Sequence, residues 1–327
     1  MQVIRGYSDV PPALGASVLA IGNFDGVHRG HQALLLETLA VARRLGRPAG
    51  AMVFEPHPRL FFRPDEPLFA LTSLEEKLRL FRALQLDFAA VIAFDAAIAG
   101  MAPAPFVDTV LVSGLKVAHV VIGYDFYFGK ARAGTPETMR ELGARHGFGV
   151  TVIPPQAEAG EVFSSSAVRA RLSSGDVRGA AIELGHYWRV SGVVTGGARL
   201  GTGMGFPTAN IRLSPGTALG HGIFAVRVGL TEPDSRRRTL QGAAYFGQRP
   251  TFDNGAPVLE TFLFDFDGDL YGREIEIEFI AFVRPDQRFP GMEALMVQMD
   301  KDCHRARELL AEADRENLFG ASPLSSA

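Results

Sequence analysis

The chain has almost no cysteine, no excess of positive charge and no long hydrophobic run. Its 327 residues include one cysteine, Cys303, so no disulfide can form within the chain and a reducing, cytoplasmic setting is expected. Lys and Arg number 33 against 36 Asp and Glu, a balance that excludes a strongly basic nucleic-acid binder. Because no run of about 18 apolar residues occurs, we expect neither a membrane-spanning helix nor a membrane partner.

Two different rhythms along the sequence indicate two domains, as is typical of a chain of this length. Between residues 17 and 184, short apolar runs alternate with amphipathic stretches of helical length. This alternation predicts an α/β fold with a parallel sheet covered on both faces. Ser73 and Glu76 have the spacing of a capping box, and Gly46 is placed as a C-cap glycine. The expected strands are 17–22, 49–54, 88–94, 117–123 and 150–153, and the expected helices are 30–45, 74–84, 105–113 and 135–145.

The second half reads mostly as strands separated by Gly, Pro and Asp turns, followed by one helix. This pattern predicts a small antiparallel β-barrel or sandwich with a terminal helix. We therefore expect one domain over residues 1–184 and a second over 185–327. The expected strands are 190–194, 223–230, 240–246, 258–264 and 275–282, and the expected helix runs from 292 to roughly 310.

The most informative motif spans residues 22–31 and reads GNFDGVHRGH, between the first expected strand and the first expected helix. In an open α/β sheet, ligands bind at the carboxyl ends of strands, where helix N-termini favour phosphate. His28 and His31 are three residues apart and can share one face of the entering turn. Two imidazoles there can donate hydrogen bonds to a polyphosphate and stabilise charge that develops on phosphorus.

A lone pair of histidines with this spacing has roughly a one-in-ten chance of taking part in chemistry, because surface pairs are common. The glycines, Asp25 and the strand–loop–helix context make the complete pattern far more specific. It resembles the nucleotidylyltransferase superfamily, which transfers AMP-like groups from nucleoside triphosphates. A zinc site is disfavoured, since no cysteine or third nearby histidine completes a ligand set.

Three further stretches follow strands or begin a helix in the same half. Residues 54–58 read FEPHP and residues 123–129 read GYDFYFG, and both follow expected strands. The aromatic residues of the second stretch are about as often plain core as a pocket for a flat ligand. Residues 164–169 read SSSAVR and predict either a phosphate-binding corner or a simple N-cap with solvated arginines.

The second half carries a glycine-rich loop followed by GFPTAN at residues 205–210. Glycines let backbone N–H groups approach phosphates closely. Thr208 and Asn210 offer neutral oxygen ligands on one side of an extended segment, which suits magnesium bound to ATP. Glu260 lies in an apolar strand, where an acid is usually just an outward-facing residue. It is a candidate base only if it faces this loop.

These motifs, in this order, resemble the bacterial bifunctional riboflavin kinase/FAD synthetase family over nearly the whole chain. The resemblance rests on GNFDGVHRGH, FEPHP, GYDFYFG, SSSAVR, GFPTAN, FGQRPTF, LETFLFDFDGDLYG and VRPDQRF. It implies that the C-terminal module phosphorylates riboflavin to FMN with ATP, releasing ADP. It further implies that the N-terminal module adenylylates FMN to FAD and releases pyrophosphate. A Rossmann-like fold and a riboflavin kinase-like barrel are implied for the two halves.

The resemblance also implies roles for individual residues. His28 and His31 would bind ATP phosphates and stabilise the adenylyl transition state, and Glu260 would accept the proton of the ribityl 5′-hydroxyl. Thr208 and Asn210 would hold Mg²⁺. The expected ATP-binding residues are Gly22, Phe24, Asp25, Gly30, Ser164, Ser165, Arg169, Gly201, Gly203 and Gly205. The expected flavin-binding residues are Asn23, Phe54, Pro56, His57, Pro58, Asp125, Phe128, Arg249, Pro250, Thr251, Arg284 and Phe289.

Two departures from the family pattern keep alternatives open. Thr202 stands where many relatives carry Arg or Lys, so the kinase module could be impaired and the chain an FMN adenylyltransferase only. Ser166 replaces a threonine but keeps a hydroxyl. A single-activity adenylyltransferase of the pantetheine-phosphate or nicotinate-nucleotide type would leave GFPTAN and Glu260 unexplained. A non-catalytic flavin-binding regulator is the other alternative, and a monomer or weak homo-oligomer is expected.

Overall fold

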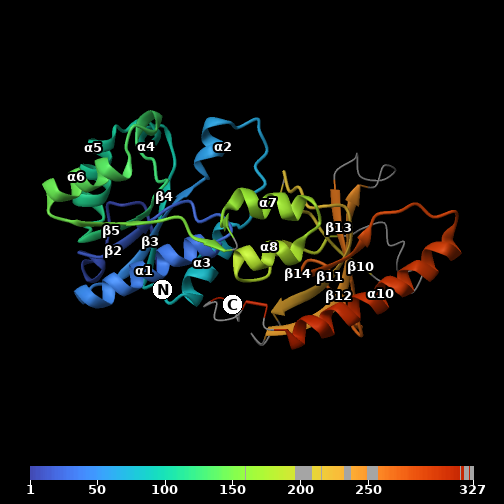
Figure 1. Ribbon diagram of the computed structural model, residues 1–327. Coiled ribbons are helices and arrows are strands. Elements are labelled where there is room, and N and C mark those ends of the chain that lie inside the picture. Colours follow the sequence, from blue (N-terminus) through green and yellow to red (C-terminus); the bar gives the residue numbers. More distant parts are fainter. Residues whose placement is uncertain are drawn as a thin grey trace. The chain divides into compact units, whose positions relative to one another are not determined.

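The computed structural model describes residues 1–158, 160–195, 208–214, 216–231, 237–248, 257–316, 318–319 and 324. The chain forms two compact units. Unit 1 holds residues 1–68, 72–164 and 326–327, and unit 2 holds residues 69–71 and 165–325. Figure 1 labels the helices and strands of both units. None of the described helices combines the length and hydrophobicity that a bilayer crossing requires.

Unit 1 is built on a six-stranded sheet in the order β1-β4-β3-β2-β5-β6, and every neighbouring pair is parallel. This confirms the expected α/β fold. β1 (Gln2–Arg5), a short edge strand with polar ends, escaped the sequence pattern. The other strands of this sheet are β2 (Val18–Ile21), β3 (Ala49–Glu55), β4 (Phe88–Ala93), β5 (His119–Gly123) and β6 (Gly149–Ile153). A two-stranded ribbon follows, β7 (Ala157–Glu158) and β8 (Glu161–Val162).

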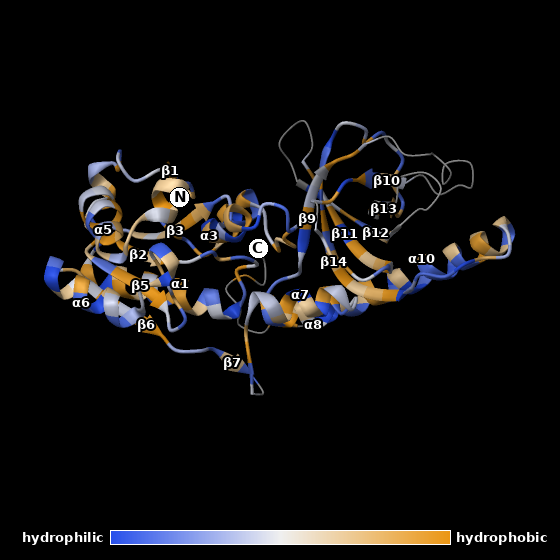
Figure 2. Cartoon of the chain, turned by 90° about the horizontal axis from the view of Figure 1, so that it is seen from above, coloured by the Kyte–Doolittle hydropathy of each residue, from blue (hydrophilic) through white to orange (hydrophobic). Residues whose placement is uncertain are grey.

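Helices cover both faces of this sheet (Figure 1). α5, η2 and α6 pack on one face around a core that includes Met52, Ile92, Val110 and Met139, while α1 and α3 lie on the other. Hydrophobic residues gather on β2, β3 and β5, whereas α1 and α6 carry both hydrophilic and hydrophobic residues (Figure 2). The helices are α1 (Arg29–Leu45), α2 (Pro58–Phe62), α3 (Leu74–Ala83), α4 (Ala96–Gly100), α5 (Pro103–Phe106) and α6 (Pro136–His146), with short helical segments η1 (Pro12–Leu14), η2 (Val107–Gly114, a π-helix) and η3 (Lys130–Arg132).

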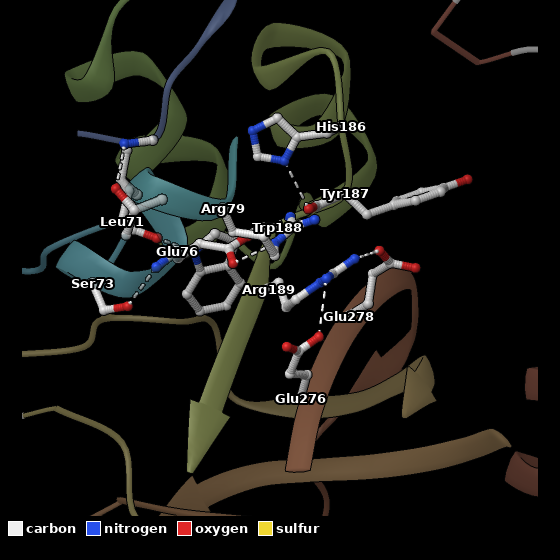
Figure 3. A network of polar contacts seen from close by, with 12 residues as sticks. Leu71, Ser73, Glu76, Arg79, His186, Tyr187, Trp188, Arg189, Glu276 and Glu278 are labelled. Atoms are coloured by element: carbon white, nitrogen blue, oxygen red, sulfur yellow. Dashed lines mark hydrogen bonds and ion pairs between the residues drawn. The ribbon is translucent and has the colours of Figure 1, made fainter. Parts of the chain in front are cut away.

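The two helix signals read from the sequence are confirmed. The hydroxyl of Ser73 accepts a hydrogen bond from the backbone N–H of Glu76 at 3.1 Å, so α3 begins where expected (Figure 3). Glu76 itself forms a two-bond ion pair with Arg79, at 2.8 Å for each bond. Gly46 ends α1 with φ +61°, a left-handed conformation that favours glycine.

Unit 2 is an antiparallel sheet in the order β10-β13-β12-β11-β14-β9. A single bridge between Thr195 and Asn210 joins the segment after β9 to β10 at the opposite edge, so the sheet closes into the expected barrel. The strands are β9 (Arg189–Val193), β10 (Thr208–Ile211), β11 (Gly222–Thr231), β12 (Arg237–Gln248), β13 (Pro257–Leu263) and β14 (Glu274–Pro285), and the helices are α7 (Ser165–Ser173), α8 (Val177–Leu184) and α10 (Met292–Arg315).

The division between the units differs from the boundary expected at Leu184. Helices α7 and α8 belong to unit 2, because Val168, Leu172 and Val177 join the core that fills the barrel. The short segment 69–71 joins the same unit, since the indole N–H of Trp188 donates to the carbonyl of Leu71 at 2.9 Å (Figure 3). In the sequence, α7 and α8 continue the α/β pattern of the first half, but in the structure their apolar residues pack into the core of the barrel.

The barrel has one core inside and a second on its outer face. Inside, Trp188 stacks on Phe279 with ring centroids 5.0 Å apart. Outside, the apolar side of α10, including Ala306 and Leu310, packs against the strands. Arg189 is buried between strands, and two carboxylates offset the cost of removing its charge from water: Glu276 at 3.0 Å and Glu278 at 2.8 Å (Figure 3).

Candidate active sites

The motif at residues 22–31 lies at the switch point of the parallel sheet. From β2 the chain runs to β3 and β4 on one side, and later returns to β5 on the other side of β2. The loops after β2 and β5 therefore flank the crevice in which α/β folds bind their ligands. The structure thus brings Asn23 and His28 to the same sheet edge as Asp125, and the 54–58 stretch lies beside them, where β3 ends.

The two histidines of the motif form a tight pair. Their rings stack with centroids 3.7 Å apart and planes 25° apart. His28 is the N-cap of α1, and its Nδ1 accepts the backbone N–H of His31 at 3.4 Å. An Nδ1 that accepts is unprotonated, so the proton of the neutral ring lies on Nε2. His28 is therefore a neutral donor with its Nε2–H available.

The position of these rings depends on Gly30. A Cβ on residue 30 would lie 3.0 Å from Cε1 and 3.1 Å from Nδ1 of His28. Such contacts are shorter than a relaxed packing distance between carbon atoms. The glycine is thus needed here for space, since its backbone is helical and requires no left-handed conformation.

Both imidazoles are held in the neutral form. Burial lowers the pKa of His28 from 6.5 to about 4. The pKa of His31 is lowered well below 6.5, first by burial and then by positive charge on His28 and Lys77. The Nδ1 of His31 is buried and has no hydrogen-bond partner among the described residues. At neutral pH this pair can offer hydrogen bonds to phosphate oxygens without carrying charge of its own.

Two expected ATP-binding residues support the loop from inside unit 1. Phe24 is fully buried and meets the ring of His31 edge-on at 5.3 Å. Asp25 is 3% exposed and accepts the backbone N–H of Thr72 at 3.1 Å. Thr72 in turn accepts the backbone N–H of Gly26 at 3.0 Å. Phe24 and Asp25 thereby fix the loop to the start of α3 and the underlying core.

Lys77 on α3 belongs to the same environment, and sequence reasoning missed it. Its side chain is only 4% exposed, although lysine is almost never buried without a partner. Burial lowers the pKa of Lys77, and the carboxylates of Asp25 and Glu55 oppose that shift. The signal in the sequence was its place beside Leu78 and one turn before Phe81, on the apolar side of the helix.

An aromatic cluster joins Phe54, the first residue of the 54–58 stretch, to α2 and to Phe94. Phe54 meets Phe94 at 5.4 Å, and Phe61 and Phe62 of α2 meet the same ring at 5.5 and 5.7 Å. Phe62 is 63% exposed, which is unusual for such a large apolar side chain. His57 caps α2 by accepting the backbone N–H of Arg59 at 3.1 Å on Nδ1. Pro56 and Pro58 flank this cap.

In the loop after β5, one aromatic residue is packed in the core and two are exposed to solvent. Phe128 is 7% exposed, stacks on Phe126 at 5.5 Å and belongs to the core of unit 1. Tyr124 and Tyr127 are exposed. The exposed rings of this loop are therefore those of the two tyrosines, and a flavin-binding role of Phe128 stays a prediction. Asp125 is exposed between them.

The expected phosphate corner at residues 164–169 is divided between the units. Ser164 ends unit 1, while Ser165 begins α7 in unit 2. The Nε of Arg169 donates to the carbonyl of Phe69 at 2.6 Å, so this arginine fastens the 69–71 segment within unit 2. The role of Ser164, Ser165 and Arg169 in binding triphosphate stays a prediction.

In unit 2, the strand register brings the expected metal ligands and base together. Asn210 of β10 is directly opposite Glu260 of β13, and Thr208 is opposite Phe262. Side chains of directly opposite residues project from the same face, with Cβ atoms about 4.5–5.5 Å apart. Thr208, Asn210 and Glu260 therefore share one face of the barrel, whereas Ala209 between them is buried in its interior.

The same row continues across the barrel. Tyr245 of β12 is opposite Glu260, Ile223 of β11 is opposite Tyr245, and Arg284 of β14 is opposite Ile223. The hydroxyl of Tyr245 donates to Asp286 at 3.3 Å. Tyr245 is a second residue that sequence reasoning left without a role, because strand register is set by tertiary structure.

Six expected residues of the kinase half lie outside the residues that the structure describes. They are Gly201, Gly203, Gly205, Arg249, Pro250 and Thr251. Thr202, the departure from the family pattern, lies in the same undescribed part. Their roles stay predictions.

Comparison with known proteins gives first the class and then the family. The FAD synthetase family matches residues 11–167, and the riboflavin kinase family matches residues 184–310. The chain is therefore a flavin-processing transferase with two catalytic modules. It belongs to the bifunctional riboflavin kinase/FMN adenylyltransferase family, and both activities are those of its modules.

Individual relatives support this assignment over almost the full chain. The bifunctional riboflavin kinase/FMN adenylyltransferase of Escherichia coli (strain K12) is 37% identical over 310 residues, which cover 94% of this chain and 97% of that protein. The enzyme of the same name from Pseudomonas fluorescens is 36% identical over 312 residues, covering 95% and 98%. The chain is also similar in fold to a solved structure titled as a macrolide-efflux protein from Streptococcus pneumoniae, with a TM-score of 0.83 at 24% identity, covering 94% of this chain and 99% of that one.

Proposed function

We propose that the kinase reaction takes place on the outer row of the barrel, where Glu260 is the base. Its carboxylate accepts the proton of the ribityl 5′-hydroxyl, the hydroxyl oxygen attacks the γ-phosphorus of ATP, and ADP leaves. The observation that carries this proposal is the direct pairing of Asn210 with Glu260. Phosphoryl transfer depends on positioning and charge neutralisation, so a base beside the cation ligands is the arrangement it needs.

Magnesium fits the donors on this row. The hydroxyl of Thr208 and the amide oxygen of Asn210 are hard, neutral ligands on one face. Within the described part of the chain, no group of three or more His, Cys, Asp or Glu residues is placed to hold a metal ion. ATP phosphates and water would complete its coordination, and the cation would neutralise phosphate charge.

For the second reaction, we propose that unit 1 binds ATP at the switch point, with its phosphates on the histidine pair. A phosphate oxygen of FMN attacks the α-phosphorus, the bond to the β-phosphate oxygen breaks, and pyrophosphate leaves. The FMN phosphate is already an anion, so no protein nucleophile is required. The Nε2–H of His28 and the ring of His31 then stabilise charge that develops on the phosphate oxygens.

The flavin is proposed to bind in unit 1 against the exposed aromatic rings near Phe54, Asn23 and Asp125, and in unit 2 near Arg284 and Phe289. Riboflavin, FMN and ATP are the substrates, and ADP, FAD and pyrophosphate are the products. A cytoplasmic location, a monomeric or weakly associating state, and the absence of nucleic-acid or membrane partners stay predictions.

The test is chromatography of flavins made by Glu260→Gln, with Glu274→Gln as the matched control. Glu274 is an exposed residue at the start of β14 and takes no part in the proposed site. We expect Glu260→Gln to form no FMN from riboflavin, while FAD formation from supplied FMN persists. Glu274→Gln should retain both activities. FMN formation by Glu260→Gln at the wild-type rate would overturn the assignment of the base.

A further inference from the structure

A buried carboxylate on α10 organises the end of the row that carries Glu260. Asp302 is 5% exposed. It accepts three hydrogen bonds, from Nε of Arg284 at 2.8 Å, from Nη2 of Arg284 at 2.7 Å, and from the side-chain amide of Gln298 at 2.9 Å. The pairing with arginine is bidentate, which fixes the plane of the guanidinium group as well as its position.

The guanidinium of Arg284 is engaged on every nitrogen. Its Nη1 donates to the carbonyl of Pro285 at 2.9 Å, and its carbon lies 5.6 Å from the centroid of the Phe289 ring. Three of the five N–H donors of Arg284 are thus used within the chain. Through these contacts Arg284 links α10, the end of β14 and the ring of Phe289 into one assembly.

This assembly borders an open groove of about 570 Å³ on the surface of unit 2. Phe289 and Gln298, which both contact the Asp302 network, are among its lining residues, together with Val297 of α10. A groove of this volume is large enough to receive a flat organic ligand. The carboxylate holds Gln298 by a direct hydrogen bond, and it holds Phe289 indirectly, through the guanidinium of Arg284 that lies over its ring.

We propose that Asp302 is a positioning residue for riboflavin in the kinase module. It holds Arg284 and Gln298, and through Arg284 the ring of Phe289, in the arrangement that receives the flavin. This inference rests on the proposed placement of the flavin near Arg284 and Phe289. Asp302 touches no reacting atom in this account, and its effect is on substrate binding.

The first test replaces Asp302 with asparagine, which keeps the size and removes the charge. We expect the KM for riboflavin to rise about tenfold, with kcat and the KM for ATP within about twofold of wild type. Asp300→Asn is the matched control, because Asp300 is exposed on the same helix, two residues away, and should leave all three constants unchanged. FMN adenylyltransferase activity of the same samples reports that unit 1 is intact.

A second variant separates positioning from folding. Asp302→Asn leaves the guanidinium of Arg284, whose side chain is 16% exposed, without its charged partner, so the melting temperature of this variant will fall. The double variant Arg284→Met with Asp302→Leu removes both charges, and we expect it to regain stability while its KM for riboflavin stays high. A KM that returns to the wild-type value together with stability would overturn the inference. An unchanged KM for riboflavin in Asp302→Asn would overturn the positioning role of Asp302. If the wild-type enzyme still makes FMN in the same assay, the proposed kinase function stands.

Discussion

Replacing Gly30 with alanine should lower the rate of adenylyl transfer without lowering the stability of unit 1. In Gly30→Ala the new Cβ would meet His28 at 3.0 Å from Cε1 and 3.1 Å from Nδ1, so the imidazole must move by a few tenths of an ångström. Misplacement by about 1 Å can cost on the order of 100-fold in rate. A smaller displacement of a ring that binds ATP phosphates is therefore expected to lower FMN adenylylation by about tenfold.

Stability should respond in the opposite direction. Residue 30 lies in the first turn of α1, and alanine is favoured over glycine in a helix interior by about 1 kcal/mol. The melting temperature should therefore remain unchanged or rise, while riboflavin kinase activity in the same chain stays at its wild-type rate. Gly100→Ala in α4 is the control, because a Cβ there meets nothing within 4 Å.

The assay is FAD formation from FMN and ATP, followed by chromatography at several ATP concentrations. A loss confined to adenylyl transfer would support the geometry of the histidine pair. Full adenylyltransferase activity in Gly30→Ala would contradict the proposed role of the histidine pair, since it would show that the position of His28 does not matter. A matching loss of kinase activity would also refute it, because unit 2 is not affected by this substitution in our account.

Two further predictions concern the charges of unit 1. The folded pKa of His28, about 4, is below its ordinary 6.5, so the unfolded chain binds a proton that folded unit 1 does not. The free energy of unfolding should therefore fall as the pH falls from 6.5 to about 4, and urea titrations should show a shallower fall for His28→Asn; equal slopes would contradict this. Lys77→Met should lower adenylyl transfer about tenfold and move the acid limb of its pH profile to higher pH, because Lys77 lowers the pKa of His31. An unchanged profile, with kinase activity as the internal control, would exclude this role.

The sequence predicted the architecture well where local signals decide it. Hydrophobic periodicity located the strands of the two large sheets except β1 and β10, Ser73 marked the start of α3, and Gly46 marked the end of α1. The motif at residues 22–31 was placed at the carboxyl edge of the sheet because strand–loop–helix order alone requires it. These features depend on residues close together in the chain.

The remaining features depend on tertiary packing. Asn210 and Glu260 are distant in sequence, and only the register of β10 with β13 places them opposite each other. Helices α7 and α8 have ordinary helical patterns, and nothing local shows that Val168 and Leu172 face the barrel's core. The burial of Lys77 and the contacts of Asp302 likewise result from elements that meet in space.

If two separate sites in one chain act in sequence, two variants that each lack one activity should complement each other when they are mixed. Glu260→Gln and His31→Gln are incubated separately and together with riboflavin, ATP and Mg²⁺, and the flavins are separated by chromatography. Glu260→Gln alone should make no FMN, His31→Gln alone should stop at FMN, and the mixture should make FAD. A mixture that makes no FAD, from two folded variants that each retain their one activity, would contradict two separate sites acting in sequence.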